Sequence, residues 1–209
     1  MKDVLNILKS TGAILSEGHF VGVSSRHMGT YINKDAFLPH TDKVSRVGRL
    51  FAEKFKNKKI EVVVGPAIGG IPLTQWTAYH LSKLTKREVL SVFTEKTSDN
   101  NQILKRGYDS VVNGKRVLIV EDTVTSGSSI KKVIKAVKKS HGEIISVAIM
   151  TNRDPKIVNA KMIGAPIISL AVLNIPSYEA KKCPLCKSNI PINTKFGHGK
   201  KFLEEQKKK

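Results

Sequence analysis

The amino-acid sequence predicts an α/β protein in which helices cover both faces of a parallel β-sheet. Two observations carry this prediction: short continuous runs of apolar, often β-branched residues, and helical patterns between several of these runs. Continuous apolar runs are typical of strands that are buried on both faces of a sheet. The sequence contains no run of 18 or more apolar residues, so no transmembrane helix is predicted.

Each element has its own signal along the chain. Helical segments are expected where apolar residues recur at helical spacing. These segments are 3–9, 42–57, 71–84 and 129–140. The expected strands are IEVVV (60–64), VLSVF (89–93), RVLIV (116–120), IISVAIM (144–150) and IISLAVL (167–173). The region 19–34 reads as short extended pieces, HFVGV and TYI, that are joined by a polar loop.

The organisation predicted from these elements is one domain over 1–177, in which about 1–40 forms a small N-terminal hood. Residues 178–209 then form a basic C-terminal extension, because they lack a strand pattern and contain nine lysines in 181–209. The two cysteines, Cys183 and Cys186, are too few for a disulfide framework and favour a reducing compartment, the cytoplasm.

The net charge of +19 is compatible with several kinds of partner. A basic chain can bind nucleic acid, or it can be an enzyme whose ligands are polyanions. A third interpretation is a lysine-rich surface that only keeps the protein soluble. Charge alone does not distinguish these three.

The segment 117–129, VLIVEDTVTSGSS, carries the most specific signal. A buried strand delivers Glu121 and Asp122 into a loop of hydroxylated residues around Gly127, and a helix follows. The N–H groups at a helix N-terminus can bind a phosphate, and glycine lets the backbone wrap it. Ionised carboxylates accept hydrogen bonds from sugar hydroxyls. The pattern therefore favours a ribose 5-phosphate over the alternative, an ordinary N-cap at Ser128 or Ser129 with a solvated acidic pair.

A second small-residue loop, GPAIGG at 65–70, also lies between a strand and a helix. It is not a Walker A loop, because Ile71 and Pro72 stand where lysine and a hydroxyl residue are required. In a parallel sheet both loops are expected at the edge formed by the carboxyl ends of the strands. A plain strand-to-helix turn is the alternative for this loop.

Segment 117–129 resembles the phosphoribosyl-diphosphate motif of the type I phosphoribosyltransferases. The resemblance implies their Rossmann-like fold, with Glu121 and Asp122 on the ribose hydroxyls and the loop from Thr125 on the 5-phosphate. Loop 65–70 is implied to bind pyrophosphate, with Mg²⁺ held mainly by the substrate. The implied substrate-binding residues are Gly65, Pro66, Ala67, Gly69, Gly70, Thr123, Thr125, Ser126, Gly127, Ser128 and Ser129.

The polar segment 95–109 lacks periodicity and is expected to be a surface loop. Loops of this length inside compact domains are often functional lids, which is the second interpretation. Its cations Lys96, Lys105 and Arg106 are candidates to close over departing pyrophosphate. In the resembled family such a loop often reaches the neighbouring subunit, which implies a homodimer. The interrupting residues 97–101 leave open which cation matters most.

Within this family the chain resembles the orotate phosphoribosyltransferases in GHF (18–20), SSRHMGTY (24–31), GPAIGGIPL, KRGY and VEDTVTSG. The resemblance implies that Arg153 pairs with the orotate carboxylate and that Thr125 bonds to the pyrimidine. It implies transfer of phosphoribosyl from 5-phosphoribosyl 1-diphosphate to orotate, giving orotidine 5′-monophosphate for UMP synthesis. For Arg153 the alternative is a surface arginine beside Asp154.

Two alternatives for the function remain at this stage. The enzyme could use a purine or xanthine, or the fold could belong to a nucleic-acid-binding regulator. The acidic pair argues against the regulator, which has no evident need for carboxylates.

In the tail, Cys183, Cys186 and His198 supply only part of a zinc site. The alternative there is a tail that packs against the core or a partner.

Overall fold

A computed structural model describes residues 2–22 and 24–207. The chain divides into two compact units. The sheet unit comprises Met1–Ile7 and Leu38–Leu173, and the terminal unit comprises Leu8–Phe37 and Asn174–Lys209. Most of the predicted hood, Leu8–Phe37, therefore shares one unit with the predicted tail, while the division into a 1–177 domain and a 178–209 extension stays a prediction. Val23, within the expected HFVGV piece, lies outside the described residues.

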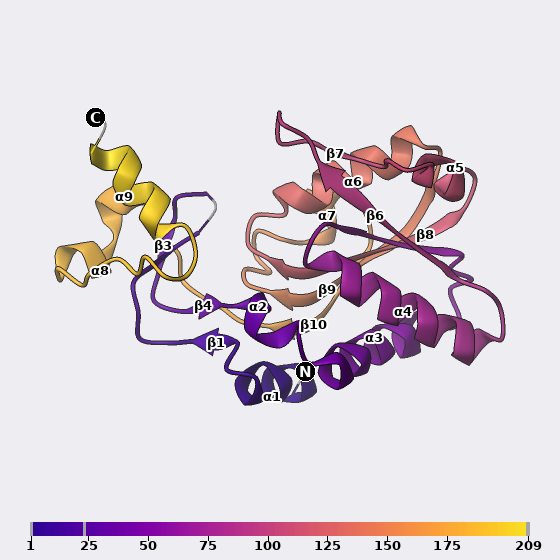
Figure 1. The fold of residues 1–209 in the computed structure, drawn as a ribbon, viewed down its shortest axis with the longest axis horizontal. Helices are drawn as coiled ribbons and strands as arrows, with labels where there is room; N and C mark the ends of the chain where they lie inside the picture. The colour runs from indigo at the N-terminus through magenta and orange to yellow at the C-terminus, as the bar shows by residue number, and fades with distance from the viewer. Residues whose placement is uncertain (1, 23, 208–209) are drawn as a thin grey trace. The chain divides into compact units, whose positions relative to one another are not determined.

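The sheet unit is built on one mostly parallel β-sheet, as predicted (Figure 1). Its strands, in spatial order, are β10 (Ile167–Val172), β9 (Glu143–Asn152), β8 (Arg116–Val124), β5 (Val62–Pro66), β6 (Leu90–Lys96) and β7 (Gln102–Ile103). Only β7 pairs antiparallel among these strands. Every residue of β5 is buried, which accounts for its unbroken apolar sequence.

Helices cover the sheet on both faces (Figure 1). The helices of this unit are α3 (Thr41–Phe55), α4 (Gly70–Thr85), α5 (Tyr108–Val112), α6 (Ser128–Lys139) and α7 (Ala160–Ile163). Helix α4 packs on the sheet and α3 packs on α4, whereas α6 contacts β8 and β9. The predicted inward residues Ile130, Val133, Ile134 and Val137 of α6 are buried. Helix α1 (Lys2–Ser10) begins in the sheet unit and ends in the terminal unit.

The terminal unit consists of short elements (Figure 1). They are β1 (Ile14–Leu15), β2 (Phe20–Val21), β3 (His27–Met28), β4 (Tyr31–Ile32), α2 (Lys34–Phe37), the 3-10 turn η1 (Ala180–Lys182), α8 (Pro184–Lys187) and α9 (Gly199–Lys207). β1 pairs with β4 and β2 with β3, both antiparallel. The two chain segments are joined by backbone hydrogen bonds of 2.8 Å in both directions between His27 and Tyr178. No helix within the described ranges has both the length and the apolar character needed to cross a bilayer.

Candidate active site

The two small-residue loops lie side by side in the sheet unit. Strands β5 and β8 are parallel neighbours, with Val62 opposite Val117 and Val64 opposite Ile119. The loops that follow these strands therefore leave from the same edge of the sheet. A Cβ atom on Gly65 would stand 2.7 Å from the carbonyl oxygen of Val120. The prediction that the two loops lie next to each other is confirmed, and their binding of anions stays a prediction.

Loop 65–70 presents backbone rather than side chains. The Ala67 N–H donates to the Thr94 carbonyl at 2.8 Å, which ties the loop to β6. The peptide bond between Ala67 and Ile68 is cis, and Ile68 is 76% exposed. Gly69 is the N-cap of α4, and none of the described side chains caps this helix end. The N-terminus of α4 therefore lacks a side-chain cap among the described residues, and its backbone N–H groups have the chemistry that suits an anion.

Segment 121–129 forms the second loop. The sequence suggested that the strand ends at Val120, before the acidic pair. In the structure β8 continues to Val124, so Glu121 and Asp122 lie inside the strand. Gly127 is the N-cap of α6 with φ of 73°, a conformation that glycine adopts without a Cβ penalty. The side chains of Ser126, Ser128 and Ser129 are exposed around it. Hydroxyls and helix N–H groups therefore converge on the space above α6.

The acidic pair is buried rather than solvated, which excludes the plain N-cap interpretation. Glu121 is 6% exposed and Asp122 is 8% exposed. The Asp122 N–H donates to Glu121 Oε1 at 3.1 Å, and the Thr123 N–H donates to Asp122 Oδ1. Burial, followed by the nearby charge of Asp122, raises the pKa of Glu121 well above its usual range. Strongly shifted carboxyls in such a position are typical of functional sites.

Arg153 joins this site from the end of β9. It is 6% exposed, and its Nη1 donates to the Thr125 hydroxyl at 3.2 Å. Its backbone N–H donates to the Val124 carbonyl at 2.9 Å. Arg153 is thus buried beside Thr125, while Asp154 Oδ1 accepts the backbone N–H groups of Lys156 and Ile157 in the turn that follows. The alternative of a surface arginine is wrong.

The segment 95–109 is more regular than the loop that was expected. Residues 95–96 end β6, 102–103 form β7, and 108–109 begin α5. Lys96 is exposed on this hairpin. Lys105 Nζ lies 3.8 Å from Glu95, and Arg106 Nε donates to the same carboxylate at 2.7 Å. These two cations are therefore held on the hairpin by Glu95, and their closure over a ligand stays a prediction.

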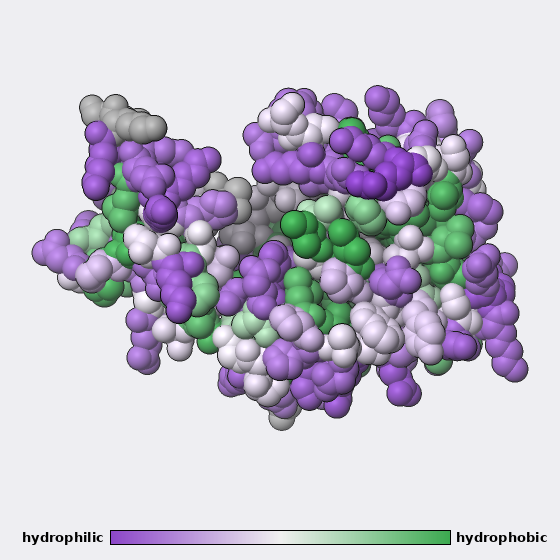
Figure 2. Space-filling model, in the orientation of Figure 1, coloured by the Kyte–Doolittle hydropathy of each residue, from purple (hydrophilic) through white to green (hydrophobic). Residues whose placement is uncertain are grey.

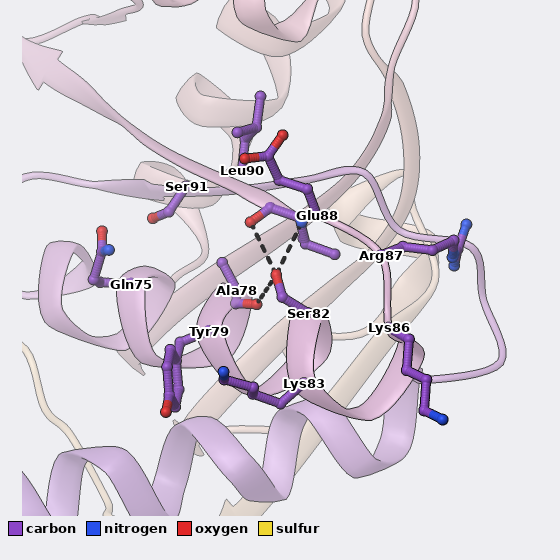
Figure 3. A pocket seen from close by; sticks show the side chains of 11 residues that line it. Gln75, Ala78, Tyr79, Ser82, Lys83, Lys86, Arg87, Glu88, Leu90 and Ser91 are labelled. Carbon is purple, nitrogen blue, oxygen red and sulfur yellow. Dashed lines mark hydrogen bonds between the residues drawn. The ribbon is translucent and has the colours of Figure 1, made fainter.

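A pocket of about 540 Å³ lies elsewhere, between the C-terminal half of α4 and the start of β6 (Figure 3). The Ser82 hydroxyl accepts the Val89 N–H at 2.9 Å and donates to the Ala78 carbonyl at 2.9 Å. These bonds fix a helix-to-strand turn at the amino end of β6, so the pocket is remote from the anion loops. Figure 2 shows hydrophilic side chains over most of the visible surface, with apolar patches between them.

In the terminal unit, Cys183 and Cys186 lie together, but His198 is not with them. His198 is exposed, and its backbone N–H donates to the Val21 carbonyl at 2.8 Å. His19 and His27 occupy the place beside the cysteines instead. The sequence offered no spacing rule that connects these histidines to cysteines more than 150 residues away.

Replacing Gly65 with alanine is expected to lower the free energy of unfolding by about 1–3 kcal/mol, because the new methyl meets backbone that cannot move aside. The Cβ would stand 2.7 Å from the Val120 carbonyl and 2.6 Å from Thr74 Cγ2. Urea denaturation measures the change. Gly29→Ala is the control, since its Cβ would meet only the Gly18 carbonyl, at 3.9 Å. Equal stability of both variants would show that β5 and β8 are not so close.

Comparison with known proteins agrees with this geometry. The family model of the phosphoribosyl transferase domain matches residues 33–163. The chain is 37% identical over 179 residues to the orotate phosphoribosyltransferase of Caldanaerobacter subterraneus, which covers 86% of this chain and 88% of that protein. It is 33% identical over 190 residues to that of Thermus thermophilus, covering 91% and 98%.

The fold is also that of solved relatives. The Mycobacterium tuberculosis orotate phosphoribosyltransferase bound to 5-phospho-α-D-ribosyl 1-diphosphate has a TM-score of 0.59 at 22% identity, covering 83% of this chain and 90% of that one. The Aeropyrum pernix orotate phosphoribosyltransferase has a TM-score of 0.64 at 23% identity, covering 81% and 93%. From the matched domain and the curated relatives together, the chain belongs to the orotate phosphoribosyltransferase family.

Proposed function

We propose that this chain transfers the phosphoribosyl group of 5-phosphoribosyl 1-diphosphate to orotate, giving orotidine 5′-monophosphate and pyrophosphate. The proposal is supported above all by one observation, the close approach of Gly65 to the Val120 carbonyl, where an added Cβ atom would stand 2.7 Å away. This close approach sets two anion-binding loops next to each other with the buried acidic pair at the edge of one. A donor with a phosphate at one end and a diphosphate at the other fits such a pair of loops.

In this proposal each loop and the acidic pair bind a different part of the donor. The 5-phosphate binds at the N-terminus of α6, and the diphosphate binds at that of α4. Glu121 and Asp122 accept the ribose hydroxyls. The bond between C1 and the diphosphate oxygen breaks with its electron pair on the diphosphate, and N1 of orotate bonds to C1 while its proton is released to solvent. Positioning and electrostatics supply the catalysis, without a covalent enzyme intermediate.

Arg153 and Thr125 form the proposed base site. A guanidinium fork suits a carboxylate, and orotate carries one on its pyrimidine ring. The hydrogen bond of Arg153 to Thr125 places both groups beside the phosphate loop that begins at Thr125. This arrangement favours orotate over purine bases, which lack the carboxylate.

The metal of this proposal is Mg²⁺. The groups near the two loops are carboxylate, hydroxyl and backbone oxygens, a hard donor set that fits this ion. Mg²⁺ keeps waters and substrate oxygens as ligands, so a dedicated protein cage is not required. When bound with the diphosphate, it stabilises the charge of the leaving group.

The remaining parts of the proposal are a homodimer working in the cytoplasm. The family resemblance supports the dimer, and exposed apolar side chains such as Tyr79, Leu84 and Leu90 offer surface for it. The low cysteine content supports a reducing compartment. Light scattering coupled to gel filtration tests the dimer, and a monomeric mass at micromolar protein would contradict it.

A base panel tests the activity. Purified protein is incubated with Mg²⁺, the diphosphate donor and, separately, orotate, uracil, adenine, guanine, hypoxanthine or xanthine. We expect kcat/KM for orotate to exceed that for any purine by at least about 100-fold, because buried polar groups left unpaired reject a wrong ligand. Pyrophosphate release with a purine and none with orotate would overturn the proposal. Salt-sensitive nucleic-acid binding without any turnover would favour the regulator instead.

A further inference from the structure

Four potential metal ligands meet in the terminal unit, away from the residues of the proposed transfer reaction. Donor atoms of His19, His27, Cys183 and Cys186 all lie within 4.8 Å of one another. His19 precedes β2, His27 lies in β3, Cys183 is the N-cap of α8 and Cys186 lies within α8. Two remote parts of the chain thus each contribute a pair of ligands.

The backbone explains why these pairs meet. In the β2–β3 hairpin, Val21 lies opposite His27, and His19 directly precedes β2. His27 exchanges two backbone hydrogen bonds with Tyr178, and the Asn193 N–H donates to the His19 carbonyl at 2.8 Å. The cysteines lie between these two points of attachment. They are therefore brought to the histidines by main-chain pairing.

The distances suit one tetrahedral ion. A zinc ion with Zn–N bonds of ~2.0 Å and Zn–S bonds of ~2.3 Å sets nitrogen–sulfur separations of about 3.5 Å. Cys186 Sγ lies 3.4 Å from His27 Nδ1 and 3.7 Å from His19 Nε2, and Cys183 Sγ lies 3.8 Å from His19 Nε2. His19 Nε2 and His27 Nδ1 are 2.7 Å apart, and an ion between them would widen that gap to about 3.3 Å.

The ring of His19 is already oriented as a ligand. Its Nδ1 lies 2.7 Å from the carbonyl oxygen of Ile190, so Nδ1 is the protonated nitrogen that donates there. Nε2 is then left with a lone pair that points at the cysteines. A backbone carbonyl that holds the second ring nitrogen in this way is the usual support of a metal-bound histidine.

A polar core without metal accounts for these residues less well. His19 is 2% exposed, and His27 and Cys183 are fully buried. Buried polar groups need hydrogen-bond partners, and thiols are weak donors and acceptors. His27 Nε2 is buried and has no hydrogen-bond partner among the described residues, so Nδ1 is the ring atom that faces His19 and Cys186. Phe202 packs edge-on against the same ring, with centroids 4.8 Å apart, and shields it.

We propose that His19 Nε2, His27 Nδ1, Cys183 Sγ and Cys186 Sγ bind one Zn²⁺ ion as a structural site. A tetrahedral set of two sulfurs and two nitrogens is characteristic of zinc. Two thiolates neutralise the dication, so the buried site carries no net charge. All four positions are filled by protein, which leaves none for a substrate and makes the site structural, not catalytic.

A structural ion is expected to stabilise the terminal unit. The terminal unit consists of two short segments from opposite ends of the chain, with strands of only two residues each. Units this small commonly need a metal or disulfides to supplement a thin apolar core. The ion would fasten the C-terminal tail to the N-terminal hairpin. This role is independent of the phosphoribosyl transfer, so either proposal can fail without the other.

Metal analysis of the untagged, full-length protein is the first test. We expect about one zinc per chain by mass spectrometry after purification without chelator. Removing zinc is expected to lower Tm by at least about 5 °C, and stoichiometric Zn²⁺ should restore it. Co²⁺ in place of Zn²⁺ should give the visible absorption of a tetrahedral site with thiolate charge transfer. A zinc-free protein whose Tm does not respond to Zn²⁺ would overturn the proposal, as would a Cys183–Cys186 disulfide in the metal-free purified protein.

Variants locate the site. Cys186→Ser and His27→Gln are expected to lower the zinc content to less than about one tenth per chain after dialysis against a weak chelator. His198→Gln is the matched control, because His198 is exposed on the same tail and lies outside the group. Loss of zinc in the His198 variant with retention in the other two would refute the assignment. If a ligand variant does not fold, the metal content and Co²⁺ spectrum of the unaltered chain decide the matter.

Discussion

Glutamine in place of Glu121 is expected to lower kcat/KM for the diphosphate donor by about 10²–10³-fold, the usual cost of removing one preorganised electrostatic contact. The amide keeps one acceptor oxygen but loses the charge that favours an oxocarbenium-like ribose. The side chain is 6% exposed, so water cannot substitute for the lost group. Steady-state kinetics with the donor varied at saturating orotate measure this effect.

The same substitution should change the pH profile. Burial raises the pKa of Glu121 well above the usual value of 4.5, so the free enzyme loses the reactive carboxylate as pH falls through that raised value. We expect kcat/KM of the parent protein to decline on the acidic side at a pH above the ordinary carboxyl range. In Glu121→Gln this acidic limb should be absent. An unchanged limb would assign the ionisation to another group.

Glu121→Gln should also stabilise the fold, in a pH-dependent manner. A carboxyl whose pKa is raised by folding contributes stability below its unfolded pKa and loses it as pH rises through the folded pKa. The Tm of the variant should therefore equal that of the parent near pH 4 and exceed it increasingly as the pH rises toward the folded-state pKa of Glu121. Each kcal/mol gained corresponds to about 2–4 °C in a protein of this size.

Glu61→Gln is a control with the opposite sign. Glu61 Oε2 accepts the Arg116 N–H at 3.0 Å, and this bond, followed by Lys115, holds the pKa of Glu61 below its usual range. Its contribution to stability is present above the unfolded pKa and is lost as pH falls, so the glutamine variant should be less stable at neutral pH. The kinetics of Glu61→Gln should match those of the parent, because Glu61 binds Arg116 at the first residue of β8, whereas the acidic pair lies near the other end of that strand. A gain in Tm for both variants would contradict the burial argument.

The central sheet was predictable because its strands are continuous apolar runs. A residue such as Val63 is fully buried, and a polar side chain there would lack a partner. The turns were marked by Gly65-Pro66 and by Gly127, where the backbone needs close approach or a positive φ. Both signals are local in sequence, and local signals are what a single sequence contains.

Polar residues hid the ends of some strands. Glu121 and Asp122 read as the start of a loop because buried carboxylates are rare, yet β8 runs through them. The β6–β7 hairpin was missed for a similar reason. Its turn at 97–101 is hydrophilic and β7 has two residues, which is too short for an alternating pattern.

The group of His19, His27, Cys183 and Cys186 could not be derived from spacing. The Cys-x-x-Cys pair is one half of a common zinc pattern, and its other half stands at the opposite end of the chain. The nearest histidine in sequence, His198, was the natural candidate and is exposed. The backbone hydrogen bonds of His27 with Tyr178 and of Asn193 with His19 bring the four residues together.

Arg153→Lys should raise KM for orotate by about 10- to 100-fold, since hydrogen bonds to charged groups contribute ~1.5–3 kcal/mol. Lysine keeps the positive charge but cannot form the planar two-donor contact with a carboxylate. KM for the diphosphate donor should change little, because Arg153 contacts the 5-phosphate loop through the Thr125 hydroxyl and is not proposed to bind a phosphate itself. Initial rates over a grid of both substrates separate the two constants.

The ratio of orotate to uracil as substrates distinguishes recognition from general damage. Uracil lacks the carboxylate that the Arg153 fork would hold, so the parent's preference for orotate should narrow in Arg153→Lys by the same factor as the rise in KM. A variant that is merely less stable would lose activity toward both bases equally. Arg116→Lys supplies the control, because Arg116 Nη1 donates to both carboxylate oxygens of Glu143, at 3.0 and 2.9 Å, at the other end of β8. If both lysine variants keep the parental ratio, Arg153 does not read the carboxylate, and the pyrimidine must be recognised by other groups.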